Sequence, residues 1–188
     1  MLSEPKQAEN QIIPTRATQG KTFDGDEENY QAAHAVDKDL STHATTYTNN
    51  GAGWLKLEFG KTYLIQKVVI YYRFYNNWYD PSSWCAQSVA NFKACVDNHN
   101  NVDVLVYQGE VKQNSCGTLR LTYALEQSDQ IYTLICNTEG DTVKLSKNTG
   151  HIVVAEAAFS GKGKMPPNFR PFGPMKLFPT VDVLFHIK

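Results

Sequence analysis

The sequence lacks any long apolar run, and no segment approaches the roughly 18 residues needed to cross a bilayer. It also lacks an excess of charge, since 18 Lys and Arg stand against 19 Asp and Glu, for a formal net charge of -1. A generic nucleic-acid binder gains affinity by neutralising phosphates with basic residues, so the composition argues against nucleic acid as a partner. With 188 residues, 41% of them hydrophobic, the chain is long enough for one domain with its own core.

Common enzyme motifs are missing as well. The chain has no Gly-x-Ser-x-Gly elbow, no phosphate-cradling glycine loop and no His-Glu-x-x-His motif, and its five histidines are scattered. Paired carboxylates for glycoside hydrolysis meet only in space, so the sequence leaves that possibility open. We interpret the acidic group Asp24, Asp26, Glu27 and Glu28 as a solvated loop. The sequence therefore predicts a protein that is not an enzyme.

The four cysteines are Cys85, Cys95, Cys116 and Cys136. They form no Cys-x-x-Cys pair and have no zinc-type His spacing nearby. We therefore favour two disulfides over the alternative of reduced thiols, and disulfides indicate an oxidising environment. The first ten residues are polar and do not read as a signal peptide. Together these features favour a secreted or extracellular protein whose leader has been removed, the alternative being an intracellular protein.

Short β-branched apolar runs predict strands. Residues 54–59 alternate with period two, as in a strand with one buried face, and after a turn at 60–62 the run 63–74 predicts a core strand. Further strands are predicted at 102–107, 118–125, 131–136, 142–145 and 151–159, each bounded by Gly, Asn or Asp. Only residues 29–36 fit a helix, with Asn29 as its candidate cap. This pattern predicts an all-β antiparallel sandwich or jelly roll with one short N-terminal helix.

The composition changes after Gly161. Residues 162–179 hold five of the eight prolines, which exclude a helix or a central strand, so this stretch is interpreted as an extended segment or a linker. Beyond it, Val181–Ile187 is a candidate strand that would dock on its own domain or on a second subunit, giving a possible homo-oligomer. The chain thus divides into an N-terminal extension (1–11), a β-sandwich (12–161) and a Pro-rich C-terminal extension (162–188).

Four segments occur in an order that resembles a known family: Arg16–Gly20, His34–Asp39, Gly53–Arg73 and Ile152–Gly161. Together they resemble the galactose-binding-like jelly roll of F-type lectins (fucolectins) and coagulation factor 5/8 C-terminal (discoidin) domains, over roughly residues 12 to 161. The resemblance implies an antiparallel eight-stranded β-sandwich jelly roll whose loops at one end bind the ligand.

The resemblance to fucolectins also implies a structural calcium ion (Ca2+) between the segment after the short helix and the last strand. The implied ligands are oxygen atoms of His34, Asp37, Asp39, Thr42, Ala155 and Glu156. Calcium takes about six to eight oxygen ligands, backbone carbonyls included, so this donor set suits it. The alternative is that Asp37 and Asp39 are ordinary turn residues, and that strand alternation points Glu156 toward solvent.

Fucolectins hold sugar hydroxyls with one His and two Arg. Here Arg73 stands at the position of the first Arg and His43 lies near the His position, but the second Arg and an adjacent cysteine pair are absent, so the resemblance does not carry fucose specificity. The loop after Arg73 is instead rich in aromatic and amide side chains. The predicted ligand contacts are His43, Arg73, Tyr75, Asn77, Trp78, Tyr79 and Trp84.

An aromatic ring offers its apolar face to the C–H side of a sugar, while Asn and Asp meet the hydroxyls. The leading hypothesis is therefore a non-catalytic, calcium-supported, lectin-like module for a glycan or glycoprotein. The alternative is a discoidin-type adhesion domain in which Trp78, Tyr79 and Trp84 bind a membrane surface or a protein; the rings also fit simple packing over the end of the sandwich. A Cys85–Cys95 disulfide would brace this loop. Pairing Cys116 with Cys136 follows the fucolectin habit and is one of three possible connectivities.

Overall fold

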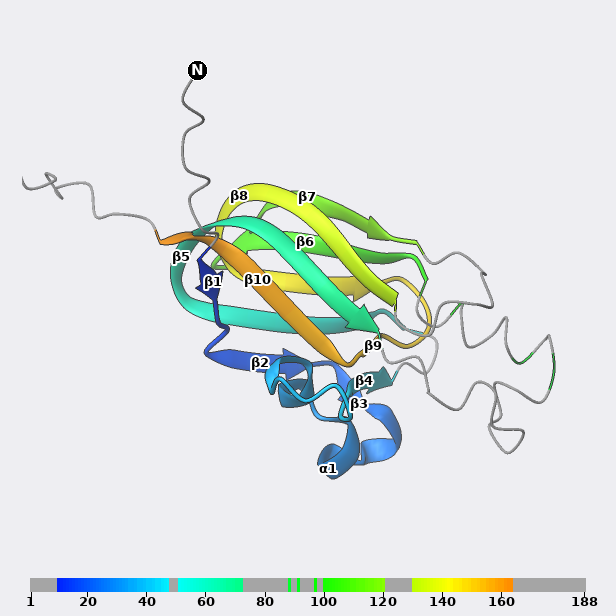
Figure 1. Cartoon of the computed structure of the whole chain (residues 1–188). Coiled ribbons are helices and arrows are strands. Elements are labelled where there is room, and N and C mark those ends of the chain that lie inside the picture. Colours follow the sequence, from blue (N-terminus) through cyan, green and yellow to red (C-terminus); the bar gives the residue numbers. More distant parts are fainter. Residues whose placement is uncertain are drawn as a thin grey trace, which may run out of the picture.

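The computed structural model describes residues 10–47, 51–72, 100–120 and 130–163, together with residues 88, 91 and 97. These residues form an antiparallel β-sandwich with short helices against one side (Figure 1). In chain order, the elements are β1 (Gln11–Ile12), β2 (Arg16–Gln19), β3 (Lys21–Thr22), η1 (Phe23–Gly25), α1 (Glu27–Tyr30), η2 (Ala32–Val36), β4 (Ala44–Tyr47), β5 (Gly53–Tyr72), β6 (Val102–Gln108), β7 (Val111–Leu119), β8 (Gln130–Lys147), β9 (Val153–Val154) and β10 (Glu156–Gly163).

Two long, bent strands build both layers of the sandwich. The first half of β5 pairs with β2 and with the second half of β8, whereas its second half pairs with β10 and with the first half of β8. At the bend Gly60 has a φ of +71°, a left-handed conformation that glycine adopts without strain. The turn predicted at residues 60–62 is thus a bend within one continuous strand (Figure 1).

The core lies between the two layers and is filled by alternate residues of the strands. Leu55 and Leu57 of β5, Val104 and Val106 of β6, and Leu145 of β8 are all fully buried. The period-two alternation of the sequence therefore marks the inward face correctly, because successive strand residues point to opposite faces. The predicted all-β jelly roll with a short N-terminal helix is confirmed.

The bends bring several strand ends to one end of the sandwich, which we call the loop end (on the right in Figure 1). Register places Gly53 opposite Lys147 and Tyr72 opposite Gln130, so both ends of β5 lie there. The start of β10 joins them, because Glu156 lies opposite Tyr71. The last described residue of β5, Tyr72, therefore lies at the loop end.

Several local predictions differ from the structure. The strands expected at 131–136 and 142–145 are parts of one strand, β8, and the strand expected at 151–159 is divided into β9 and β10. The helix expected at 29–36 is broken at Gln31, whose backbone is extended (φ -67°, ψ 155°), into α1 and the 3-10 helix η2. The cap is Asp26, which accepts a 3.1 Å hydrogen bond from the N–H of Asn29, so part of the acidic group interpreted as a solvated loop caps a helix. The strand expected at 118–125 begins instead at Val111. Its first five residues are exposed and, apart from Val111, polar, so they show no alternation of apolar and polar residues.

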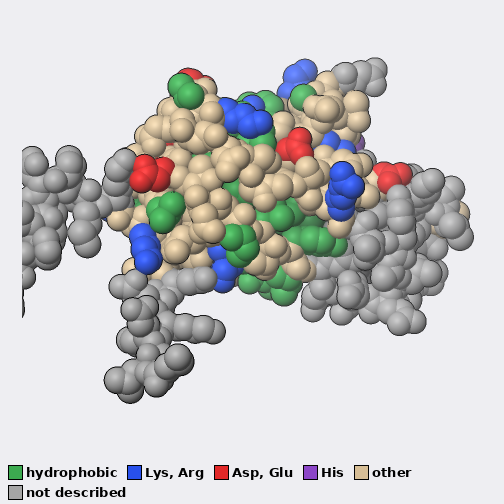
Figure 2. Space-filling model, turned by 90° about the horizontal axis from the view of Figure 1, so that it is seen from above, with side chains coloured by type: hydrophobic (Ala, Val, Ile, Leu, Met, Phe, Trp, Pro, Cys, Tyr) green, Lys and Arg blue, Asp and Glu red, His purple; other side chains and the backbone are tan. Residues whose placement is uncertain are grey.

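A disulfide joins β7 to β8 through Cys116 and Cys136, whose Cα atoms are 4.4 Å apart. This pairing confirms one of the two predicted disulfides, while Cys85 and Cys95 lie outside the described residues. Figure 2 shows Lys, Arg, Asp and Glu interspersed over one face, with exposed hydrophobic side chains between them. Within the described ranges, no helix is long and apolar enough to span a membrane.

Candidate functional site

A hydrogen bond connects the loop after η2 to the last strand. The backbone N–H of Lys38 donates to Oε2 of Glu156 at 2.9 Å, across 118 residues of sequence. Lys38 has a φ of +67°, a left-handed conformation uncommon for a residue with a side chain. Glu156 is only partly exposed, and its carboxylate accepts this bond from the loop.

The carboxylate of Asp37 organises the same loop. Its Oδ1 accepts the N–H of Asp39 at 2.9 Å, and its Oδ2 accepts the hydroxyl of Thr42 at 2.7 Å. Asp39 turns its own carboxylate to Ser41, accepting both the N–H (2.8 Å) and the hydroxyl (2.6 Å), and these bonds hold the pKa of Asp39 below its usual range. The carbonyl oxygen of Asp39 accepts from Thr42. These are bonds that turn residues make, and they also gather oxygen atoms in one place.

The carboxylates of Asp37 and Glu156 are close enough to repel each other. Burial raises the pKa of Glu156, and the negative charge of Asp37 raises it further, while the N–H of Lys38 opposes the shift. We call the region formed by Asp37, Asp39, Thr42, Ala155 and Glu156 the acidic corner. No group of three or more His, Cys, Asp or Glu side chains arranged to hold a metal is found among the described residues. The oxygens available here are instead two side-chain carboxylates, a hydroxyl and backbone carbonyls, which is an all-oxygen donor set that suits calcium.

For two of the predicted calcium ligands, His34 and Ala155, only the backbone carbonyl oxygen was predicted to bind the ion. The imidazole of His34 bonds outside the acidic corner: its Nδ1 donates to the carbonyl oxygen of Asn29 (3.2 Å) and its Nε2 meets the amide of Gln31 (3.3 Å). Only a backbone oxygen was expected from His34, and that role stays a prediction. Ala155 is fixed at the loop end, since its N–H donates to the carbonyl of Tyr71 at 2.9 Å.

His43 is the one predicted ligand contact that the structure describes. It is only 5% exposed, and its ring packs edge-on against Tyr30, with centroids 5.1 Å apart. Gln19 secures this region by donating from Nε2 to the carbonyl oxygen of Tyr30 at 2.9 Å. His43 is therefore almost fully covered in the structure. The other predicted contacts, Arg73, Tyr75, Asn77, Trp78, Tyr79 and Trp84, lie outside the described residues.

An aromatic cluster that the sequence does not reveal lies beside His43. Phe23 meets His151 edge-on at 5.3 Å, and Tyr47 stacks on His151 at 5.7 Å with an interplanar angle of 27°. Nδ1 of His151 donates to the carbonyl oxygen of Thr46 at 2.9 Å, which orients the ring. The three rings are about 25 to more than 100 positions apart in the chain, and only the tertiary fold brings them together, so no local sequence pattern predicts the cluster.

Comparison with known proteins supports the fold. No protein-family model and no curated protein sequence matches the chain. Among solved structures, a fucose-binding module from Streptococcus pneumoniae superposes with a TM-score of 0.58 at 14% identity, covering 84% of this chain and 99% of that one. A carbohydrate-binding module from Clostridium perfringens, solved with GalNAc-β-1,3-galactose, gives 0.55 at 17% identity, covering 77% and 93%. A fucolectin from striped bass (Morone saxatilis) serum gives 0.53 at 13% identity, covering 82% and 50%.

These similarities extend over most of the chain. At 13 to 17% identity they establish the fold. The chain therefore has the galactose-binding-like jelly-roll fold that carbohydrate-binding modules and F-type lectins share, as the four sequence segments predict.

Proposed function

We propose that this protein is a non-catalytic, lectin-like recognition module that binds carbohydrate at the loop end. The observation that carries the proposal is the connection between Glu156 and the loop of Asp37. Glu156 lies opposite Tyr71, two residues before Arg73. The acidic corner thereby lies beside the end of β5, directly before residues 73–84 in the sequence, and a rigid base lowers the entropy that a binding loop loses when it holds a ligand.

Calcium supports this base in the proposal. The carboxylates of Asp37 and Glu156, the hydroxyl of Thr42 and the carbonyls of His34, Asp39 and Ala155 would hold it. A divalent cation between the two carboxylates would remove the repulsion by Asp37 that, after burial, raises the pKa of Glu156. The ion is structural here: it stabilises the junction between the loop of Asp37 and β10.

Ligand contacts come from His43, Arg73, Tyr75, Asn77, Trp78, Tyr79 and Trp84. The aromatic rings cover the apolar face of a sugar ring, while Arg73 and Asn77 donate to its hydroxyls. The glycan specificities of the structurally similar modules, fucose for one and GalNAc-β-1,3-galactose for another, support a carbohydrate ligand. Two observations support a secreted protein. Glycan ligands are presented outside cells, and a disulfide such as that between Cys116 and Cys136 persists in an oxidising environment.

A glycan array probed in calcium and in EGTA tests the proposal. We expect glycan signals that fall in EGTA and are lost in Arg73→Ala and in Trp78→Ala. Arg16→Ala is the matched control, because Arg16 lies on β2, is 71% exposed and forms only a surface ion pair with Glu58. Absence of any glycan signal, together with binding to anionic liposomes, would overturn the proposal and favour the discoidin-type membrane-binding alternative.

A further inference from the structure

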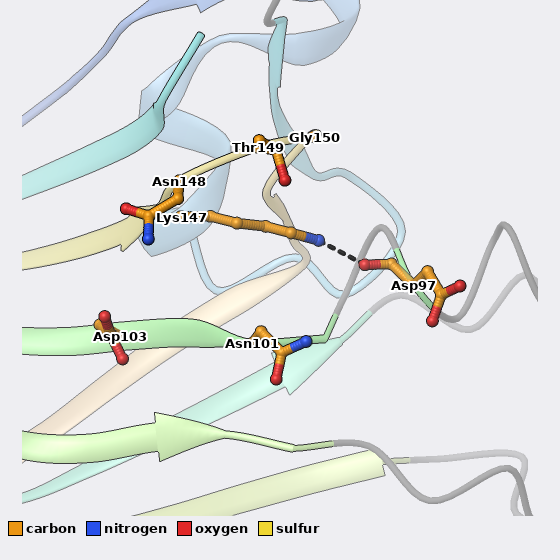
Figure 3. Close-up of a pocket in the computed structure, with 7 residues that line it drawn as sticks. All are labelled: Asp97, Asn101, Asp103, Lys147, Asn148, Thr149 and Gly150. Carbon is orange, nitrogen blue, oxygen red and sulfur yellow. Dashed lines mark hydrogen bonds between the residues drawn. The ribbon is translucent and has the colours of Figure 1, made fainter. Parts of the chain in front are cut away.

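A polar pocket opens at the loop end, between the end of β8 and the start of β6 (Figure 3). Its volume of about 460 Å³ falls within the roughly 300–1,000 Å³ typical of small-molecule sites. Its walls are formed by Asp97, Asn101, Asp103, Lys147, Asn148, Thr149 and Gly150. None of these residues belongs to the acidic corner or to the predicted ligand contacts, so the pocket is a separate feature of the loop end.

Lys147 is the unusual member of the pocket, because it is a cation that is only 8% exposed. Its Nζ donates to the backbone carbonyl of Asp97 (Figure 3), and within the described part of the chain it forms no ion pair. An ammonium group has three N–H donors, and buried donors without acceptors are costly. Burial accordingly lowers the pKa of Lys147, which the charge of Asp97 partly offsets. The pocket therefore holds donors that an oxygen atom of a ligand would satisfy.

The opposite wall of the pocket supplies acceptors. Asp103 lies on β6 opposite Ser146, near the end of β8 (Figure 3), and its Oδ1 accepts the hydroxyl of Thr118 on β7 at 2.5 Å. Next to it, Asn101 has a φ of +58°, a conformation that Asn tolerates better than most residues. Its N–H is held by the carbonyl of Leu119 at 2.9 Å. These bonds fix the wall in place before any ligand arrives.

The charges of the pocket select the kind of ligand. The negative charges of Asp97 and Asp103 would repel an anion, and the ammonium of Lys147 would repel a metal ion or an organic cation. A neutral hydroxyl group both donates and accepts, so it bonds favourably to the ammonium and to a carboxylate at once, and such charge-assisted bonds are the stronger kind. We propose that this pocket binds the hydroxyl groups of a neutral saccharide, as a second subsite at the loop end. The proposal rests on the proposed function, since it assigns part of the same glycan to a named pocket.

A purely structural role for Lys147 makes a different prediction. If the lysine only fastened Asp97 to the end of β8, its replacement would lower stability and leave glycan binding unchanged. Lys147→Met retains the apolar stem and removes the three donors. Asn148→Ala is the second variant, because Asn148 is exposed and its truncation is not expected to affect folding. Lys144→Met, on the same strand with its ammonium over the ring of Trp54, is the matched control.

The test is a titration of the 15N-labelled full chain with galactose, fucose and GalNAc-β-1,3-galactose, followed by backbone amide shifts. We expect GalNAc-β-1,3-galactose to shift the amides of Asn101, Asn148 and Gly150. We also expect Lys147→Met to weaken its binding by about tenfold or more, as loss of hydrogen bonds to a charged group implies. Asn148→Ala should weaken binding less, and Lys144→Met should leave it unchanged.

The outcomes separate the two proposals. If none of the three sugars shifts any amide, the proposed function fails and the subsite fails with it. If a sugar binds but the amides around the pocket do not move and both pocket variants bind as the wild type does, the pocket proposal alone is overturned. A titration with sodium sulfate checks the charge argument, because sulfate shifting the same amides would show that the pocket selects anions and would overturn the assignment to neutral hydroxyls.

Discussion

The N–H of Lys38 and the carboxylate of Glu156 meet at 2.9 Å although 118 residues separate them in the chain. The contact joins the loop after η2 to the first residue of β10, at the end of the sandwich where β5 leads into Arg73. Because the loop also carries Asp37, the junction places two carboxylates together, and its stability should depend on what neutralises them.

Calcium should stabilise the wild-type protein and not Glu156→Gln. A ligand that binds only the folded state at about 100 times its dissociation constant adds about 2.7 kcal/mol, which corresponds to a rise in Tm of roughly 5–10 °C for a chain of this size. The glutamine retains an acceptor for the N–H of Lys38 but lacks the charge that attracts the ion. Thermal melts in CaCl2 and in EGTA measure the difference, and an equal calcium response in both proteins would contradict the assignment.

Without calcium, the wild-type protein should lose stability as the pH rises through the pKa of Glu156. Burial, and then the charge of Asp37, raise the pKa of Glu156 in the folded state. The unfolded chain therefore releases this proton first as pH rises, so the folded state loses stability as pH increases above about 4.5 and through the raised pKa. In EGTA, Glu156→Gln should be more stable than the wild type at pH 7 and equal to it near pH 4. Urea unfolding across that range tests this, and a wild type that is the more stable at pH 7 would contradict it.

A pair of isoleucines tests the assignment of faces in the sandwich. Ile70 is fully buried and Ile135 is 61% exposed, although both lie on long strands of the same sheet. Ile70→Ala should cost about 2–5 kcal/mol of unfolding free energy through lost burial and a residual cavity. Ile135→Ala should stay within about 0.5 kcal/mol. Denaturant titrations of the two variants compare them directly. Similar losses of unfolding free energy would mean that the buried and exposed faces of β5 and β8 are assigned wrongly.

The disulfide between β7 and β8 should contribute measurably to stability. Cys116 and Cys136 close a loop with a sequence separation of 20, for which loop-closure entropy gives about 3 kcal/mol. A double variant, Cys116→Ala with Cys136→Ala, removes the bond without leaving a free thiol. It should unfold at lower denaturant than the wild type under oxidising conditions. Should both proteins unfold at the same concentration, the crosslink does not constrain the unfolded chain.

The strands that alternate with period two could be predicted from the sequence, and so could the fold class. In residues 54–59 and 102–107 every second side chain is apolar, and this alternation predicts which face of the strand is buried. The start of β7 could not be found this way, since an edge strand exposed on its polar face has no such alternation. The helix boundary at Gln31 escaped for a related reason, because a short helix held by tertiary contacts follows packing more than local propensity.

Part of the candidate site could also be predicted from the sequence, and part could not. Asp37 and Glu156 were paired only through the resemblance of whole segments to a family, and the structure brings them together. The pocket of Lys147 carries no sequence signal, because Asp103 lies next to the end of β8 only through the pairing of Asp103 with Ser146. A lysine near the end of a strand is ordinarily solvated, and only the fold shows that this one is covered.

The position of β10 has a kinetic consequence. This strand, the last described along the chain, inserts between β1, the first, and β5. The sheet cannot close until residues 156–163 are available, and such pairing between distant segments makes folding slow. During synthesis β1 and β5 therefore stay unconnected until β10 has been made. When β10 pairs with both, it completes the hydrogen-bond ladder and brings Glu156 to the loop of Asp37.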